Sequence, residues 1–453
     1  MKIKTIHFMK AEGNPLYVQV YDAIKHDILN GYLHYGDQLP SIRTCARQLS
    51  LSRTSIEAAY QRLLLEGYII AKAQKGYFVD VDEKNADLRK VILAQVKPKK
   101  IAEKEIDLRS SSIDATSFDT AIWMHYLKEV LQDEHVIMAY GDPQGEKELR
   151  VALQKYIYSM RGVLSQEQQI LVGASFQSLL YLICSLYEGE KVVGMEIGGF
   201  PQAEQVFQDC GFTLVMLEQD EGGVRMEDLR KHKIGILYLN SASCGSEKKA
   251  LRSSRRSALL QYAKQEQILL LEDDHNGELR YRSKMRPAMQ GFDRGQQVIY
   301  IRSFSKLLLP SLRVSFMVLN ETFSARYAQR KNRYNPSASK IEQLALARYL
   351  SDGHLERQVR RLKKRYEKKS GLMLDALQEE FPTVTTTLDE SALQIILHMD
   401  ASIDIDVYIQ RAFEHHILLQ KSTLGEITLS FAAIGEADIS SLVHQLKEIW
   451  QTI

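Results

Sequence analysis

The residues best suited to chemistry lie between positions 268 and 313. Lys306 follows an apolar strand-like run and a turn of small residues, in Ser303-Phe304-Ser305-Lys306. A lysine placed there can form a Schiff base with the aldehyde of pyridoxal phosphate (PLP). Asp273 follows the apolar run 268–271, at the strand end where α/β sheets gather their ligands, so its carboxylate can hold a proton on a pyridine nitrogen. This pair indicates a PLP site.

A phosphate group needs hydroxyl, amide and guanidinium donors, and the sequence offers all three. Ser303 and Ser305 carry hydroxyls beside the lysine, and Arg313 comes seven residues after it. The strand-to-helix turn at Ser175 and Phe176 presents backbone amides of the kind that cradle phosphate. Each feature alone is common in proteins, as a surface lysine, a helix cap or a small-residue turn. Their order within one α/β chain is what favours a cofactor site.

A second signature lies near the N-terminus and is of a different kind. Apolar spacing predicts helices over 15–33, 41–49 and 54–65, followed by short strands at 68–70 and 76–79. Three helices and a two-stranded wing make a winged helix-turn-helix, whose second helix of the pair enters the major groove of DNA. The residues predicted to contact DNA are Arg43, Ser52, Arg53, Thr54, Ser55, Lys75 and Gly76.

The charge of the N-terminal region, called the head below, supports the prediction of DNA binding. Residues 1–79 hold ten Lys and Arg against six Asp and Glu, a net of +4, whereas the whole chain of 453 residues has a net charge of +2. A basic surface suits phosphate contacts. A trihelical protein-interaction domain with a polar face is the alternative interpretation of the same pattern.

The rest of the chain is predicted to form a linker and a large α/β domain. Residues 81–106 are rich in Lys, Asp and Glu and have no apolar face, which predicts a linker between a head at 12–80 and a domain at 107–453. Continuous apolar strands alternating with helices predict a largely parallel sheet covered on both faces. A long helical stretch at 338–380 precedes a smaller C-terminal α/β lobe.

Composition excludes several classes of protein. No run of 18 apolar residues is present and no secretory signal opens the chain, so we expect no membrane span. The four cysteines are widely separated, and the twelve histidines form no metal motif. These features predict a protein of the reducing cytoplasm without a metal site.

Two resemblances extend these predictions. Segments 15–17, 36–43, 51–54 and 65–68 closely resemble the GntR-type winged-helix domain. Segments 140–145, 272–274, 303–306 and 310–313 resemble the fold-type I aminotransferase domain of MocR-type regulators, in which that domain follows a GntR-type head. The resemblance implies Lys306 as the Schiff-base lysine, with Asp273 at the pyridine nitrogen and Ser303 and Arg313 at the phosphate. It also implies Tyr140 as a phosphate contact, within the subunit or across a dimer interface.

Three positions depart from the family pattern. His275 stands where the family has a tyrosine near the phenolic oxygen of PLP, and residues 240–247 lack the usual His-Gln-aromatic-Pro segment. Thr428 stands where an arginine grips a substrate carboxylate. A threonine cannot replace that guanidinium, whose charge-assisted hydrogen bonds contribute roughly 1.5–3 kcal/mol each.

The sequence therefore predicts a cytoplasmic, homodimeric transcription regulator that is not an enzyme. Its head binds a double-stranded DNA operator, and its aminotransferase-like domain binds PLP and senses PLP or a small amine or amino acid. Two alternatives stay open. One is an active PLP-dependent aminotransferase with a DNA-binding appendage, and the other is a regulator whose degenerate domain no longer binds PLP.

Overall fold

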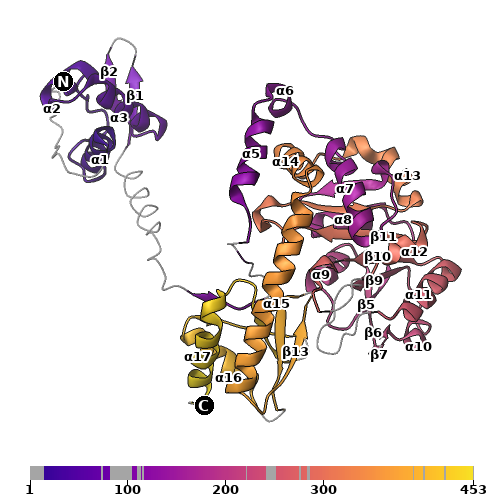
Figure 1. The fold of residues 1–453 in the computed structure, drawn as a ribbon. Helices are drawn as coiled ribbons and strands as arrows, with labels where there is room; N and C mark the ends of the chain where they lie inside the picture. Colours follow the sequence, from indigo (N-terminus) through magenta and orange to yellow (C-terminus); the bar gives the residue numbers. More distant parts are fainter. Residues whose placement is uncertain are drawn as a thin grey trace. The chain divides into compact units, whose positions relative to one another are not determined.

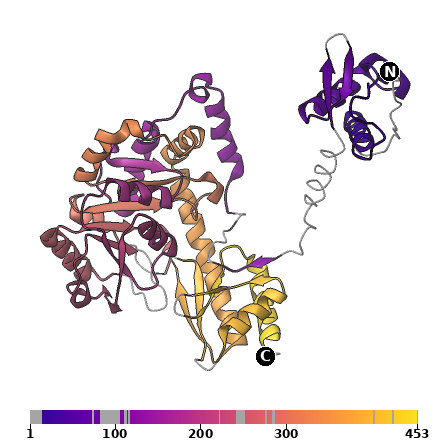
Figure 2. The same ribbon diagram turned by 180° about the vertical axis from the view of Figure 1, so that it is seen from behind.

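The computed structural model describes residues 15–72, 75–81, 105–109, 114, 117–220, 222–240, 251–274, 277–282, 286–390, 392–400, 403–422 and 425–451. The chain divides into two compact units, Met1–Ala102 and Glu103–Ile453 (Figures 1 and 2). Each unit has its own hydrophobic core.

The first unit is the predicted winged helix-turn-helix. Helices α1 (Leu16–Leu29), α2 (Ile42–Leu49) and α3 (Arg53–Leu65) enclose a small apolar core, and β1 (Ile69–Lys72) pairs antiparallel with β2 (Gly76–Val79). The hydroxyl of Ser41 caps α2 and that of Ser52 caps α3. Because Ser52 is the cap, α3 begins at Arg53, one residue before the predicted start.

The second unit is built on a seven-stranded sheet, and the predicted largely parallel arrangement is confirmed. In spatial order the strands are β4 (Ile170–Gly173), β12 (Ser315–Val318), β11 (Val298–Ser303), β10 (Leu269–Asp273), β9 (Ile236–Asn240), β5 (Val192–Glu196) and β6 (Thr213–Leu217). β12 runs antiparallel to both neighbours, and the pairs from β11 to β6 are parallel. β6 was not predicted, because it is a partly exposed edge strand.

Both faces of this sheet are covered by helices, as its continuous apolar strands predict. Successive strand residues point to opposite faces, so Val172 and Phe316 enter one apolar cluster while Leu171 and Met317 enter another. The helices of this unit's large domain are α5 (Thr120–Leu131), α6 (Glu134–Ile137), α7 (Lys147–Arg161), α8 (Phe176–Leu186), α9 (Pro201–Asp209), α10 (Met226–Leu229), α11 (Ser253–Glu266), α12 (Met289–Asp293) and α13 (Glu321–Arg330).

The predicted helical stretch 338–380 is two helices rather than one. α14 (Lys340–Ser351) ends before Gly353, whose φ of 69° is left-handed, and α15 (His354–Glu380) begins after it. Glycine adopts this conformation without strain, so the chain can turn there. α15 then runs from the large domain into the C-terminal lobe (Figure 1).

The smaller C-terminal α/β lobe is also confirmed. Its antiparallel sheet has the order β13 (Thr385–Asp389), β14 (Gln394–His398), β17 (Ile427–Ser430) and β16 (Gln420–Lys421), with helices α16 (Ile405–Glu414) and α17 (Ile439–Gln451). β3 (Ile106–Asp107) pairs in parallel with β15 (Ile417–Leu418) of this lobe, and β7 (Gln219–Asp220) pairs with β8 (Gly223–Val224) in the large domain. Within the described ranges, no helix has both the length and the apolar character needed to cross a bilayer.

Candidate cofactor site and DNA-binding head

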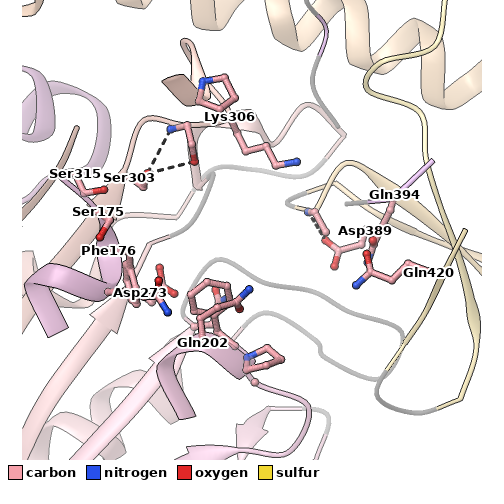
Figure 3. Close-up of a pocket in the computed structure, with 18 of the residues that line it drawn as sticks. Ser175, Phe176, Gln202, Asp273, Ser303, Lys306, Ser315, Asp389, Gln394 and Gln420 are labelled. Atoms are coloured by element: carbon pink, nitrogen blue, oxygen red, sulfur yellow. Dashed lines mark hydrogen bonds between the residues drawn. The ribbon is translucent and has the colours of Figure 1, made fainter. Parts of the chain in front are cut away.

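A cavity of about 510 Å³ lies between the large sheet and the C-terminal lobe (Figure 3). One wall comes from the strand ends and following loops of β4, β5, β9, β10 and β11. The opposite wall comes from strands β13, β14, β16 and β17. The size lies within the range of small-molecule and cofactor sites, and the position is the one where α/β sheets bind ligands.

The cavity brings together seven of the nine residues predicted at the cofactor. They are Ser175, Phe176, Asp273, Ser303, Ser305, Lys306 and Arg313. Tyr140 does not line the cavity, and the residue is 97% exposed. His275 lies outside the described residues.

Lys306 is held by buried neighbours in the turn after β11. The amides of Leu307 and Leu308 donate to the carbonyl of Phe304 at 3.0 and 2.9 Å, and all three of these side chains are buried. Burial disfavours the charged ammonium and lowers the pKa of Lys306 to about 8, although the carboxylate of Asp107 opposes this shift. A lysine with this pKa has a substantial neutral fraction near physiological pH, which is the form that attacks a carbonyl.

Asp273 ends β10 and is buried. The hydroxyl of Tyr238, on the adjacent strand β9, donates a 2.5 Å hydrogen bond to its Oδ2 atom. Burial raises the pKa of Asp273 to about 7, the Tyr238 hydrogen bond opposes the shift, and neighbouring carboxylates add to it. A carboxyl of this pKa suits proton sharing with a pyridine nitrogen.

Tyr238 is a site residue that the sequence did not reveal. In the parallel register of β9 and β10, Tyr238 pairs with Leu271 and Asn240 pairs with Asp273. Side chains on alternate residues share a face, so both β9 residues lie on the face of Asp273. Within one sequence, Tyr238 is a single aromatic residue in an apolar strand and resembles any core residue.

A buried network of charges holds the chain immediately after Asp273. Arg161 donates to both carboxylate oxygens of Asp274 at 2.6 and 2.8 Å, and the hydroxyl of Tyr300 donates to Oδ2 at 2.6 Å. Burial alone would raise the pKa of Asp274, but Arg161 holds it below its ordinary value. Arg302 pairs with Glu278 in the same interior. The network fixes the end of β10 and therefore the position of Asp273.

The donor set around the cavity fits PLP. Ser175 caps α8 by accepting a 3.1 Å hydrogen bond from the amide of Ser178, and residues 174–177 at the N-terminus of this helix line the cavity. The hydroxyls of Ser303 and Ser305 lie 3.2 Å apart, and Arg313 lines the same wall. Together with Lys306, these groups supply an amine and phosphate donors in one cavity.

Phe200 is a cavity-lining residue that was not predicted from the sequence. It follows β5, lines the cavity and meets Phe176 edge-on, with ring centroids 5.5 Å apart. The same rule that located Asp273 would have located it, because Gly198 to Pro201 also follow a buried strand at the ligand-binding edge.

Thr428 lies on the opposite wall, in β17. Its side chain is buried and its hydroxyl donates to the carbonyl of Gln420 at 3.1 Å. The hydroxyl of Thr428 is therefore used as a hydrogen-bond donor to the backbone of the adjacent strand β16. In the part of the chain that the structure describes, Arg313 is the one arginine lining the cavity, and it belongs to the large-domain wall.

The predicted DNA-contacting residues lie at the N-terminus of α3, on α2 and at the wing. Arg53 is the first residue of α3 and is exposed, as is Arg43 on α2. Ser52 accepts a hydrogen bond from the amide of Ser55 at 3.2 Å, and its hydroxyl lies 2.9 Å from that of Thr54. These hydroxyls are thus partly engaged in capping, so the guanidinium of Arg53 is the stronger candidate for base recognition.

The wing presents Lys75 and Gly76 to solvent. Gly76 has a φ of 100°, a conformation that favours glycine, and the carbonyl of Lys75 accepts a 2.7 Å hydrogen bond from the side chain of Gln38.

In the described ranges, His, Cys, Asp and Glu side chains form no group of three able to hold a metal ion.

Comparison with known proteins places both units in families. Residues 16–79 match the family described as "Bacterial regulatory proteins, gntR family", and residues 103–446 match "Aminotransferase class I and II". The chain is 30% identical over 449 residues to the uncharacterized HTH-type transcriptional regulator YdeL of Bacillus subtilis, covering 96% of this chain and 97% of that protein. It is 25% identical over 421 residues to the probable rhizopine catabolism regulatory protein MocR of Rhizobium meliloti, covering 89% and 84%. The chain belongs to the MocR-type regulators.

A solved structure agrees on the fold of the second unit. An archaeal alanine:glyoxylate aminotransferase superposes with a TM-score of 0.70 at 19% identity, covering 81% of this chain and 95% of that structure. This MocR-type regulator is therefore a transcription regulator that joins a GntR-type DNA-binding head to an aminotransferase-like domain, of a class whose members bind PLP.

Replacing Arg53 with alanine is expected to weaken operator binding by roughly tenfold to a hundredfold, the loss that about 1–3 kcal/mol of base recognition gives. The measurement is fluorescence anisotropy with a duplex selected by the wild-type regulator from a random-sequence library. Arg62→Ala is the matched control, because Arg62 pairs with Glu66 at 3.1 Å near the other end of α3. Equal losses in both variants would show that Arg53 contributes charge alone.

Proposed function

We propose that the aminotransferase-like domain binds PLP at Lys306 and that its occupancy, by PLP or by an amine captured there, changes how the head binds operator DNA. The observation that carries this proposal is that one cavity holds a half-buried lysine, Lys306, and the buried carboxyl of Asp273. Lys306 has its pKa lowered to about 8, and Asp273 has its pKa raised to about 7. Perturbed groups of this kind cluster at functional sites.

Each predicted residue has a role in this proposal. PLP, when bound, supplies an electrophilic aldehyde and an electron-withdrawing ring. Lys306 provides the amine, and Asp273, oriented by Tyr238, holds a proton at the ring nitrogen. Ser303, Ser305, Arg313 and the amides at Ser175 and Phe176 bind the phosphate. His275 is proposed near the phenolic oxygen.

Sensing is favoured over transamination by the C-terminal wall. Thr428 occupies the place of the carboxylate-binding arginine and donates its hydrogen bond to Gln420. A substrate amino acid in the usual pose would lack its bidentate partner there. Transamination is the second candidate function, supported by the fold that the second unit shares with aminotransferases.

A homodimer is proposed on the basis of exposed apolar side chains between positions 124 and 140. They are Met124, Leu131, Ile137, Met138 and Tyr140. Exposed large apolar residues of this density mark interaction surfaces. Tyr140 then contacts the phosphate of the partner subunit's site, which accounts for its absence from the cavity of its own chain.

The remaining proposals concern the head and the division of the chain. Residues 12–80 bind the double-stranded operator through the residues at α2, α3 and the wing, residues 81–106 link the two units, and residues 107–453 form the effector and dimerisation domain. A regulator that acts on DNA in this way works in the cytoplasm.

The test is a titration of the full-length protein with PLP, followed by visible absorption and by anisotropy with the selected duplex. We expect a new visible band that saturates at one PLP per chain, together with a changed affinity for the duplex. No band would overturn PLP binding and leave the domain as a dimerisation module. A band without any change in DNA affinity, with PLP alone or with added amines, would overturn sensing.

A further inference from the structure

Helix α15, the long helix of Figure 1, has a strongly basic exposed face in its first half. Residues 354–369 hold eight Lys and Arg against two Asp and Glu, a net of +6, whereas the whole chain has a net charge of +2. Helix residues advance about 100° each, so the exposed Arg357, Arg360, Arg361 and Lys364 fall within one arc of about 100°. These four residues, called the α15 strip below, present four positive charges on one side of the helix.

The charges of the α15 strip are not compensated by carboxylates. The guanidinium of Arg357 donates to the carbonyl of Asp352 at 2.8 Å, and that of Arg361 donates to Oε1 of Gln358 at 2.6 Å, so both acceptors are uncharged. In the part of the chain that the structure describes, no carboxylate lies within ion-pair distance of a strip residue. Burial lowers the pKa of His354 in the first turn of α15, and the positive charge of Arg357 lowers it further, against the opposing charge of Asp352. The charge of the strip therefore acts on a neighbouring titratable group.

Three neighbouring cations of the same helix are paired. Arg365 and Lys369 both pair with Asp114, at 3.2 and 2.8 Å, and Lys368 pairs with Glu436. The protein thus supplies carboxylates to the cations that hold this part of the second unit together and none to the α15 strip. Protein surfaces that are only solvated mix charges of both signs, whereas a field of one sign attracts a partner of opposite charge.

We infer that the α15 strip is a second DNA-binding surface, which contacts the phosphate backbone of operator DNA outside the sequence that the head reads. The strip spans about 10 Å along the helix axis, because each residue adds about 1.5 Å. Each strand of a duplex carries one phosphate per roughly 3.4 Å of its axis, so the strip matches about three phosphates of one strand. Arginine and lysine bind phosphates without reading the base sequence.

Duplex DNA is favoured over other polyanions because the head of the same chain binds it. Residues 82–104 separate the described parts of the two units in sequence, and a chain of that length spans at most about 80 Å. A duplex held by the head is therefore present at a raised effective concentration for the α15 strip. The inference rests on operator binding by the head and goes beyond the proposed sensing, because it does not require PLP.

The experiment compares two duplexes by fluorescence anisotropy with the full-length protein over a range of salt concentrations. One contains the sequence selected by the wild type alone, and the other continues into unrelated sequence for about 20 base pairs, or roughly 70 Å, on each side. We expect the long duplex to bind at least tenfold more tightly at low salt. Its logarithmic salt dependence should be steeper by about 2–3 for each strip engaged. Equal affinities for the two lengths at every salt concentration would overturn the inference.

The double variant Arg360→Gln with Lys364→Gln tests the α15 strip itself. Both side chains are exposed, so glutamine leaves the packing of α15 unchanged. We expect the preference for the long duplex to fall at least fivefold and its salt dependence to become shallower by roughly 2, with no change for the short duplex. The matched control is Lys231→Gln with Lys233→Gln, which removes the same charge from two exposed lysines that are each paired with a carboxylate. A wild-type preference in the strip variant, or an equal fall in the control, would overturn the inference.

The short duplex separates this inference from the proposal for the head. If the wild type does not bind it, operator binding by the head fails, and the strip is then tested on an unrelated duplex of the longer length. A lower affinity of the strip variant for that duplex, with the control unchanged, would still support the inference, and equal affinities would overturn it. Binding of the wild type to phosphatidylserine vesicles that the strip variant loses, with DNA binding unchanged, would assign the strip to a membrane surface and also overturn it.

Discussion

Replacing Lys306 with alanine is expected to abolish the visible band that PLP gives with the wild-type chain. The band requires a covalent bond to an amine, and among the described residues Lys306 is the lysine on the large-domain wall of the cavity. Its turn is anchored by the buried side chains of Phe304, Leu307 and Leu308, so alanine at 306 leaves the local fold intact. The measurement is an absorption titration, with borohydride reduction and mass spectrometry to locate the modified residue.

The pH dependence of band formation follows from the environment of this lysine. Burial disfavours the charged form and lowers the pKa of Lys306 from its ordinary 10.5 to about 8. The reactive neutral amine is the form present above the pKa, so the rate of band formation in the wild type should rise through pH 8 and level off above it. A rate that continues to rise towards pH 10 would show an ordinary, exposed lysine.

Lys421→Ala is the matched control for this prediction. Lys421 lines the opposite wall of the same cavity, and its ammonium is paired with Asp406. We expect that variant to form the band as the wild type does. A band of undiminished intensity in Lys306→Ala, or its loss in Lys421→Ala, would assign the cofactor bond to a different lysine.

The large-domain half of the site was predictable because its residues follow apolar strands. Asp273 and Lys306 each come after a continuous buried strand, and parallel strands bring their carboxyl ends to one edge of the sheet. Local sequence therefore contains the information that places them together. The same reasoning reached Ser303 and Ser305, whereas Arg313 was predicted from its position seven residues after Lys306 and from the family resemblance.

The other half of the site depends on contacts that local sequence does not specify. Asp389, Gln394 and Gln420 reach the cavity because the C-terminal lobe packs against the large domain through the long helix α15. The role of Tyr238 depends on the register between β9 and β10. Tyr140 is placed by family resemblance alone, and a single chain leaves it exposed.

Replacing Asp274 with alanine is expected to lower the free energy of unfolding of the second unit by about 3–5 kcal/mol, the range for removing one partner of a buried ion pair. Arg161 and Asp274 are 3% and 0% exposed in their side chains. Alanine would leave the guanidinium of Arg161 buried without its carboxylate, and the hydroxyl of Tyr300 without its acceptor. The measurement is urea unfolding followed by tryptophan fluorescence, because Trp123 and Trp450 are both buried in this unit.

The control variant Glu129→Gln shows whether the expected loss in the free energy of unfolding comes from the burial of the Asp274 ion pair or from the loss of any ion pair. Glu129 and Arg348 form an ion pair of 2.9 Å whose side chains are 41% and 45% exposed, so its loss should change stability by no more than about 1 kcal/mol. Since Asp274 follows Asp273 directly, its replacement should also weaken PLP binding, and Glu129→Gln should not. Equal stability losses in the two variants would show that the buried network does not hold the end of β10, and the position of Asp273 would then depend on Tyr238 and the strand register alone.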